Sequence, residues 1–343
     1  MSRPDRGDGP DRREAPDPSA AGTVGPATAG PAGAAGHLPA QAGPVLALVG
    51  PTAAGKSEVA IEVAEELGAE IVAVDAFTVY RGMDVGTAKP AAALRARVPH
   101  HGLDLLEPEQ DCSVEWFQGQ ARAAVAAVHA RGRLPLLVGG SGLYFRAVVD
   151  DLRFPPTDPE VRAALTARYA ADPRAAHAAL ARSDPAAAAR IDPENLRRTV
   201  RALEVATLTG TPFSAWRTVW EQHAAVYPDL VVVGLDRDRE ELWARIDRRV
   251  AAMLEAGLLE EAAALATRRL STTARQAIGY AEALAHLAHG GQPSVTREAI
   301  AVRTRRFAAR QRRWFRADPR VAWAGPEDAR SRLLRAGQEA RAT

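Results

Sequence analysis

Cysteine and lysine are nearly absent from this chain of 343 residues. It has one cysteine, Cys112, and among its 44 basic residues only Lys56 and Lys89 are lysines. A single cysteine cannot form an internal disulfide, so we expect a cytoplasmic protein in which Cys112 is an ordinary packed thiol. Two lysines in a chain that otherwise uses arginine indicate positions where a compact ammonium group matters.

Long apolar runs and a strong net charge are also missing. No stretch of 18 apolar residues occurs, so we expect no membrane-spanning helix. The formal net charge is +2, so a surface for nucleic acid has to come from local clustering of arginines. Apolar residues make up 47% of the chain, which excludes global disorder. Residues 1–43 are rich in Pro, Gly and Ala and show no periodicity, which predicts a disordered tail without the apolar core of a signal peptide.

One motif organises the rest of the chain. Residues Gly50–Ser57 fit the pattern G-x-x-x-x-G-K-[ST] of a phosphate-binding loop, and a strand pattern precedes them and a helix pattern follows them. Glycines let backbone N–H groups close around phosphate oxygens, and the helix N-terminus adds a positive dipole. Lys56 would neutralise phosphate charge, and the Ser57 hydroxyl would bind Mg²⁺. The diphosphate-binding candidates are Gly50, Pro51, Thr52, Ala53, Ala54, Gly55, Lys56 and Ser57.

The ends of the next two apolar strands carry further candidates. Asp75 follows a strand at 70–74, which predicts a general base beside the phosphate loop, although a helix cap or a loop ion pair would explain it too. The strand at 134–138 ends in two glycines and Ser141, where a P-loop ATPase usually has a magnesium-binding aspartate. That difference disfavours a motor or switch NTPase and indicates close backbone approach to a ligand.

The sequence pattern changes between residues 151 and 227, where short Ala-rich helical patterns alternate with Asp-Pro pairs at 158, 172, 184 and 192. Each pair fits a helix cap followed by a first-turn proline, so we predict an all-helical insertion. Arg197, Arg198 and Arg201 fall on neighbouring turns of one helix and suit either phosphate contact or a solvated face. After a strand at 230–235, the arginine-rich segment 297–316 suits either RNA or an amphipathic helix packed on the core.

These residues leave three function classes open: a small-molecule kinase, a transferase that releases diphosphate and uses RNA as acceptor, and a non-catalytic RNA-binding module. The intact loop with Lys56 disfavours the third, and the length beyond the sheet with its basic clusters disfavours the first.

An ordered set of motifs then resembles the tRNA dimethylallyltransferase family, also called tRNA isopentenyltransferases or IPP transferases. The resemblance covers residues 45–321 and lies in Gly50–Ser57, Val74–Asp75, Tyr80–Pro90, Pro99–His101 with Asp104, Val138–Tyr144, Arg201–Val205, Ile278–Tyr280, and Arg310–Gln311 with Trp314–Arg316. It implies an α/β fold with a P-loop NTPase-like parallel sheet flanked by helices and an all-helical insertion domain.

The family's activity implies transfer of a dimethylallyl group from its diphosphate to N6 of the adenosine on the 3′ side of the tRNA anticodon. The adenosine would be flipped into a channel, and the loop would hold diphosphate with Mg²⁺ instead of ATP. Asp75 would accept the N6 proton. A related alternative is an adenylate isopentenyltransferase, which prenylates free nucleotide but needs no basic helical insertion. The partners implied are a tRNA anticodon stem-loop and dimethylallyl diphosphate, and we expect a monomer.

The resemblance also assigns residues. Catalytic roles would fall to Thr52, Lys56, Asp75 and Ser141, with Arg245 and Arg249 reaching the diphosphate and Ser57 the metal. Residues implied to contact tRNA are Asp75, Ala76, Phe77, Thr78, Ser141, Arg162, Arg197, Arg198, Thr199, Val200, Arg201, Gln276, Ala277, Ile278, Gly279, Tyr280 and Ala281. Ala76, Thr78 and Ala309 stand where the family has Ser, Gln and Lys, and Ser141 stands where it has Thr. The expected organisation is a tail (1–43), a first core part (44–150), the insertion (151–227), a second core part (228–325) and a C-terminal tail (326–343).

Overall fold

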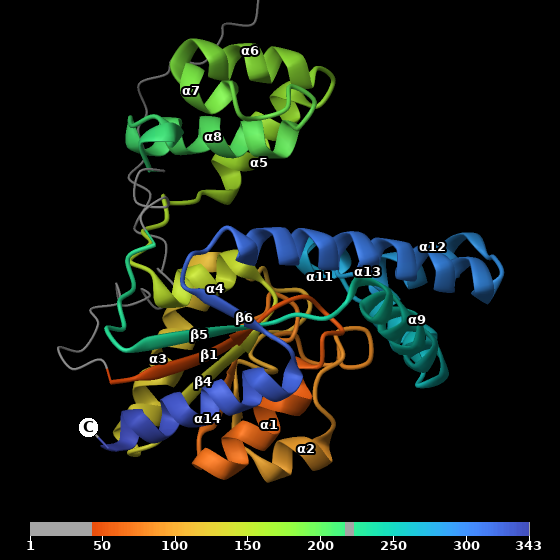
Figure 1. Ribbon diagram of the computed structural model, residues 1–343. Coiled ribbons are helices and arrows are strands. Elements are labelled where there is room, and N and C mark those ends of the chain that lie inside the picture. The colour runs from red at the N-terminus through yellow and green to blue at the C-terminus, as the bar shows by residue number, and fades with distance from the viewer. Residues whose placement is uncertain (1–42, 217–222, 343) are drawn as a thin grey trace, which may run out of the picture. The chain divides into compact units, whose positions relative to one another are not determined.

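A six-stranded parallel sheet forms the centre of the computed structural model, which describes residues 43–216 and 223–342. The strand order is β3-β2-β4-β1-β5-β6 (Figure 1). The strands are β1 Val45–Val49, β2 Glu70–Ala73, β3 His100–His101, β4 Pro135–Gly139, β5 Leu230–Leu235 and β6 Val321–Ala324. The fold therefore has the predicted α/β class, and the expected tail lies outside the described residues except for Gly43.

Helices cover both faces of the sheet (Figure 1). Helix α1 (Lys56–Leu67) and helix α14 (Pro326–Ala342) pack against each other on one face, and α3 (Val114–Ala130) and α4 (Gly142–Val149) lie on the other. All five residues of β1 are buried because it lies inside this covered sheet. This is why the central strands read as continuous apolar runs.

The remaining core helices follow β2 and β5 in the chain. They are α2 (Ala92–Arg97), α9 (Arg239–Glu255), α10 (Leu258–Ala266), α11 (Thr272–Arg275), α12 (Tyr280–His289) and α13 (Pro293–Arg316). Within the described residues, none of the helices is long and apolar enough to span a membrane.

Three parts of the core differ from the sequence-based expectation. The edge strands β3 and β6 were not predicted, because β3 is two histidines with no apolar pattern and the four residues of β6 are too short a run to be recognised. The segment 326–343, expected to be a tail, is helical as α14 up to Ala342. Its Leu333 and Leu334 are buried in the main core, and a Cβ on Gly337 would lie 2.3 Å from Leu67 Cδ1, so this helix packs tightly on α1.

The helical insertion contains α5 (Pro159–Tyr169), α6 (Pro173–Ser183), α7 (Pro185–Ala188) and α8 (Leu196–Thr209). Its own small hydrophobic cluster consists of Leu180, Ala187, Ala188 and Ala202. Asp158, Asp172 and Asp184 cap helices that start with proline, as predicted. Asp192 does not: its Oδ1 accepts a bond from Glu194 N within a turn, and Asn195 caps α8 instead.

Candidate active site

The loop between β1 and α1 curls around the ammonium group of Lys56. Gly50 has a φ of +141°, and a Cβ there would lie 2.6 Å from Leu235 O, so only glycine fits. Lys56 Nζ donates hydrogen bonds to Gly50 O (3.0 Å) and Pro51 O (2.7 Å). The positive charge is thus held inside the curve of the loop, at the N-terminus of α1.

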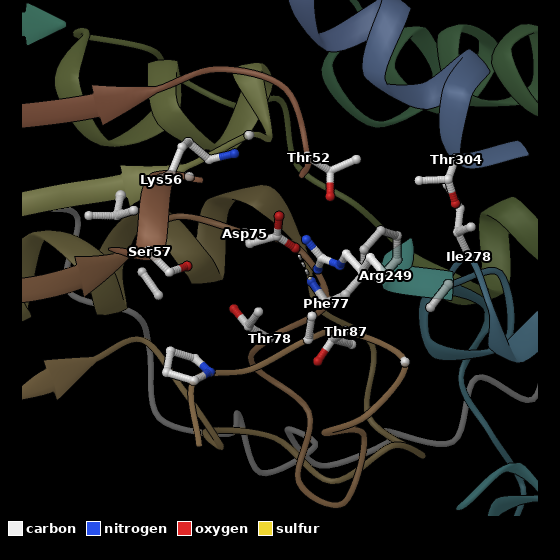
Figure 2. Close-up of a pocket in the computed structure, with 18 of the residues that line it drawn as sticks. Thr52, Lys56, Ser57, Asp75, Phe77, Thr78, Thr87, Arg249, Ile278 and Thr304 are labelled. Carbon is white, nitrogen blue, oxygen red and sulfur yellow. Dashed lines mark hydrogen bonds between the residues drawn. The ribbon is translucent and has the colours of Figure 1, made fainter. Parts of the chain in front are cut away.

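Asp75 lies just beyond the end of β2, in the same cavity as Lys56 (Figure 2). Its Oδ1 accepts a bond from Phe77 N (2.9 Å) and its Oδ2 accepts one from Ser141 Oγ (3.2 Å). Burial raises the pKa of the Asp75 carboxyl, and the bond from Phe77 N partly offsets this effect. The sequence prediction that Asp75 stands beside the phosphate loop is therefore matched by the geometry.

Lys56 and Arg249 place two positive charges close to this carboxyl (Figure 2). Burial and the nearby Arg249 guanidinium lower the pKa of Lys56 to about 7, although Asp75 acts in the opposite direction. Burial also lowers the pKa of Arg249. Burial makes the charged forms of both side chains less stable. A bound anion would stabilise these charged forms, because solvent reaches them poorly.

Helix α9 brings the two arginines that were implied to bind diphosphate to the outer side of the loop. Arg245 Nε donates to Ala53 O (2.8 Å), and Arg249 lines the cavity. A second, more basic cavity is lined by Ala53, Gly55, Lys56, Ser57, Glu58, Arg245, Arg248 and Arg249. Lys56, Ser57 and Arg249 line both cavities, whereas Gly50, Pro51 and Ala54, which were also predicted to bind diphosphate, line neither.

A metal ion fits this place only with help from a substrate. No group of three or more His, Cys, Asp or Glu side chains with metal-binding spacing occurs in the described part of the chain. Mg²⁺ usually keeps several waters and binds substrate phosphates with one or two protein groups. Ser57, which lines both cavities at the start of α1, is suited to be such a group.

The cavity that contains Asp75 has both polar and apolar walls, and the apolar side chains come from the sheet and from two helices. Ile71, Ala73 and Val138 belong to the sheet, whereas Val250, Met253, Ile300 and Phe307 belong to α9 and α13. The cavity has a volume of about 180 Å³. It therefore offers room for an apolar group directly beside a carboxylate and a phosphate loop.

The segment 75–78 reaches this cavity through Asp75, Phe77 and Thr78, whereas Ala76 is buried behind it. Thr78 Oγ1 is shielded from solvent and has no hydrogen-bond partner within the described residues. Of the segment 276–281, Ala277 and Ile278 line the cavity. Tyr280 is fully buried, and its hydroxyl accepts a bond from Gly86 N (3.1 Å) and donates one to Glu261, so it is not on a surface that RNA could touch.

The arginines implied to grip tRNA divide into two groups. Arg162 and Arg201 donate to the buried Glu204, with closest distances of 2.9 Å, so they hold the insertion together. Arg197 and Arg198 are exposed, whereas Thr199 and Val200 are buried beneath them. Only the first two residues of the segment 197–201 therefore present a fully exposed positive charge.

One residue that lines the cavity belongs to a motif of the family resemblance, but no role for it followed from the sequence. Gln311, on α13, accepts a bond from Thr52 N (2.8 Å) and donates one to Gly140 O (2.9 Å). The glycines at the end of β4 serve this packing: a Cβ on Gly139 would lie 2.0 Å from Val74 O, and one on Gly140 would lie 2.3 Å from Gln311 Nε2. Both glycines also line the cavity that contains Asp75, so close approach of a ligand to this backbone stays a prediction. The one signal in the sequence that marks this residue is a glutamine within the arginine-rich segment 297–316.

Known proteins match the chain over most of its length. The family model described as IPP transferase matches residues 78–318, and the model described as Isopentenyl transferase matches residues 43–96. A tRNA dimethylallyltransferase of Kineococcus radiotolerans is 52% identical over 289 residues, which is 82% of this chain and 90% of that protein.

Two solved structures are similar as well. The full-length tRNA isopentenylpyrophosphate transferase of Bacillus halodurans has a TM-score of 0.62 and 36% identity, covering 87% of this chain and 97% of that one. A eukaryotic dimethylallyltransferase acting on tRNA has a TM-score of 0.70 and 25% identity, covering 87% and 77%. With the site geometry and these matches in agreement, the chain belongs to the IPP transferase family of tRNA dimethylallyltransferases.

Proposed function

We propose that the protein transfers a dimethylallyl group from dimethylallyl diphosphate to N6 of the adenosine on the 3′ side of a tRNA anticodon, with release of diphosphate. One observation carries the chemistry: the carboxyl of Asp75 and the ammonium of Lys56 line a single cavity that also has apolar side chains from the sheet, α9 and α13 in its walls. The relatives' names supply the acceptor, because they describe proteins that act on tRNA.

In this reaction the N6 nitrogen forms a bond to C1 of the dimethylallyl group while the bond from C1 to the diphosphate oxygen breaks. Diphosphate leaves with the electron pair, next to Lys56, Arg245 and Arg249. Asp75 accepts the N6 proton, and its raised pKa makes it a stronger base than an ordinary aspartate. Ser141 keeps one carboxyl oxygen in place through its 3.2 Å bond.

Two further groups complete the proposed site. A divalent cation, which we take to be Mg²⁺, would add positive charge at the leaving group when bound by Ser57 and diphosphate oxygens. The Thr78 hydroxyl, which has no partner among the described residues, stands where it could bond an edge of the flipped base. It would replace the glutamine that the family has at this position.

The helical insertion would hold the anticodon stem, with Arg197 and Arg198 as its exposed phosphate contacts. We further infer that the protein acts as a cytoplasmic monomer. The residues proposed for the chemistry all come from one chain, and its single cysteine suits a reducing compartment.

The test compares acceptors. Purified protein, dimethylallyl diphosphate and Mg²⁺ are incubated with unmodified tRNA or with AMP, and the nucleosides are analysed by mass. We expect prenylated adenosine from tRNA alone, formed at a much lower rate by the Asp75→Asn variant. Prenylation of AMP but not of tRNA would favour an adenylate isopentenyltransferase. Phosphorylation of a small molecule by ATP that is lost in Lys56→Ala would favour a kinase.

A further inference from the structure

Gln311 is a buried amide at the junction of three segments that are far apart in the sequence. It lies on α13 and is only 5% exposed. Its Oε1 accepts the 2.8 Å bond from Thr52 N in the phosphate loop, and its Nε2 donates the 2.9 Å bond to Gly140 O after β4. One side chain thus joins the phosphate loop to the strand end that carries Ser141.

The link needs both bonds, and a neutral amide makes both at once whereas an ionised carboxylate cannot. Thr52 N is a donor and Gly140 O is an acceptor, so the bridging group has to accept at one end and donate at the other. A carboxylate could not donate to Gly140 O, and an apolar side chain would leave both backbone groups without a partner.

The local packing fixes the position of the amide as well. A Cβ on Gly140 would lie 2.3 Å from Gln311 Nε2 and 3.0 Å from Gly50 O. The absence of a side chain at Gly140 therefore lets the glutamine approach the backbone and brings the phosphate loop against the end of β4. Ser141, the next residue, bonds Asp75, so the link continues to the carboxylate.

We propose that Gln311 is a positioning residue that sets the distance between the phosphate loop and the Asp75–Ser141 pair, and so aligns the departing diphosphate with the base. This role rests on the proposed function. An allylic transfer needs the leaving group, the carbon and the acceptor nitrogen nearly in line, and a misplacement of about 1 Å can cost about 100-fold in rate.

The first test replaces the amide by an apolar side chain of similar length. Gln311→Met should lower kcat by about 100-fold while the KM values for tRNA and for dimethylallyl diphosphate stay close to those of the wild type. Gln118→Met is the matched control, because Gln118 Nε2 also bonds two backbone carbonyls, Ala147 O (2.8 Å) and Leu152 O (2.9 Å), away from the proposed chemistry. It should lose stability without losing kcat.

A second test uses protonation. In Gln311→Glu the carboxylate can accept from Thr52 N but cannot donate to Gly140 O until it is protonated. The ratio of the variant's kcat to that of the wild type should therefore rise as the pH falls. A ratio that does not change with pH would contradict the two-ended bond.

A third test asks whether Gly140 and Gln311 act through the same link. Gly140→Ala should lower kcat on its own, and the double variant with Gln311→Met should be hardly worse than Gln311→Met alone. If the fold-decrease in kcat of the double variant equals the product of the two single decreases, the proposal is overturned. An unchanged kcat in Gln311→Met, or an equal decrease of kcat in Gln118→Met, would overturn it too. Absence of tRNA prenylation in the wild type would instead overturn the proposed function, which keeps the two failures apart.

Discussion

Ser141 Oγ donates a 3.2 Å hydrogen bond to Asp75 Oδ2 and so joins the end of β4 to the end of β2. These strands are neighbours in the sheet, and their carboxyl ends meet where ligands bind in open α/β folds. The bond holds the carboxylate while its other oxygen faces the backbone of Phe77. The proposed base is therefore oriented by two strands before any substrate arrives.

Replacement of Asp75 tests the base. Asp75→Asn keeps the size of the side chain but removes its ability to take a proton, so kcat should fall by about 10²–10⁴. The rate is measured as prenyl transfer to tRNA under saturating substrates. Ser141→Ala removes only one hydrogen bond to the carboxylate and should cause a smaller loss. Near-normal turnover in Asp75→Asn would exclude Asp75 as the base.

The pH profile of kcat/KM for dimethylallyl diphosphate should be bell-shaped. Asp75 works as a carboxylate with a raised pKa, so activity is lost as the pH falls through that raised value. Lys56 works as an ammonium with a pKa of about 7, so activity is lost as the pH rises through about 7. Calorimetry in buffers of different ionisation enthalpy should show proton uptake on diphosphate binding at pH 8, because Lys56 is mostly neutral there and the bound anion favours its charged form. Absence of uptake would contradict the assignment to Lys56.

The buried Glu204 should decide the stability of the helical insertion. Glu204→Ala leaves Arg162, Arg201 and Asp158 N without their shared acceptor, which should cost about 2 kcal/mol because hydrogen bonds to a buried carboxylate are lost while the two arginines can still reach solvent. Urea unfolding and hydrogen exchange in α5 and α8 measure the loss. Glu194→Ala, which breaks the exposed pair with Arg174, should change stability by less than about 0.5 kcal/mol.

Arg197 and Arg198 should contribute to tRNA affinity through phosphate contacts. Each substitution to alanine should weaken tRNA binding for all sequences alike and lower the slope of log K against log salt by roughly one. Binding is measured by filter retention or fluorescence at several salt concentrations. Arg332→Ala on α14 is the control, because Arg332 pairs with Asp328 on that helix and should leave the slope unchanged.

The sequence predicted the parts of the fold that local patterns determine. Strands β1, β2, β4 and β5 were recognised because continuous apolar runs follow from burial on both faces. The meeting of Asp75 with the phosphate loop was also predictable, because parallel strands end at one edge of the sheet. Strands β3 and β6 were not, since their pairing with longer strands defines them more than their own residues do.

The sequence could not predict contacts that depend on distant segments. Gln311 meets Thr52 across 259 positions, and no local pattern marks that pairing. Lys89, one of the two lysines whose ammonium group was expected to matter, is buried and bonds Asp84 (2.7 Å) and Asp104 (2.6 Å). The family resemblance implies that Arg162 and Arg201 contact tRNA, and only the fold shows that both donate hydrogen bonds to Glu204.

The hydrophobic cluster of the helical insertion is small and consists largely of alanine, with Leu180 as its one large fully buried side chain. Alanine contributes little apolar area, so opening this cluster costs much less free energy than opening the sheet. A protease should therefore cleave the insertion in brief openings while the catalytic frame stays folded. Because the helices of the insertion can shift at a low cost in free energy, they would adjust to anticodon stems that differ in shape without disturbing the residues that carry out the reaction.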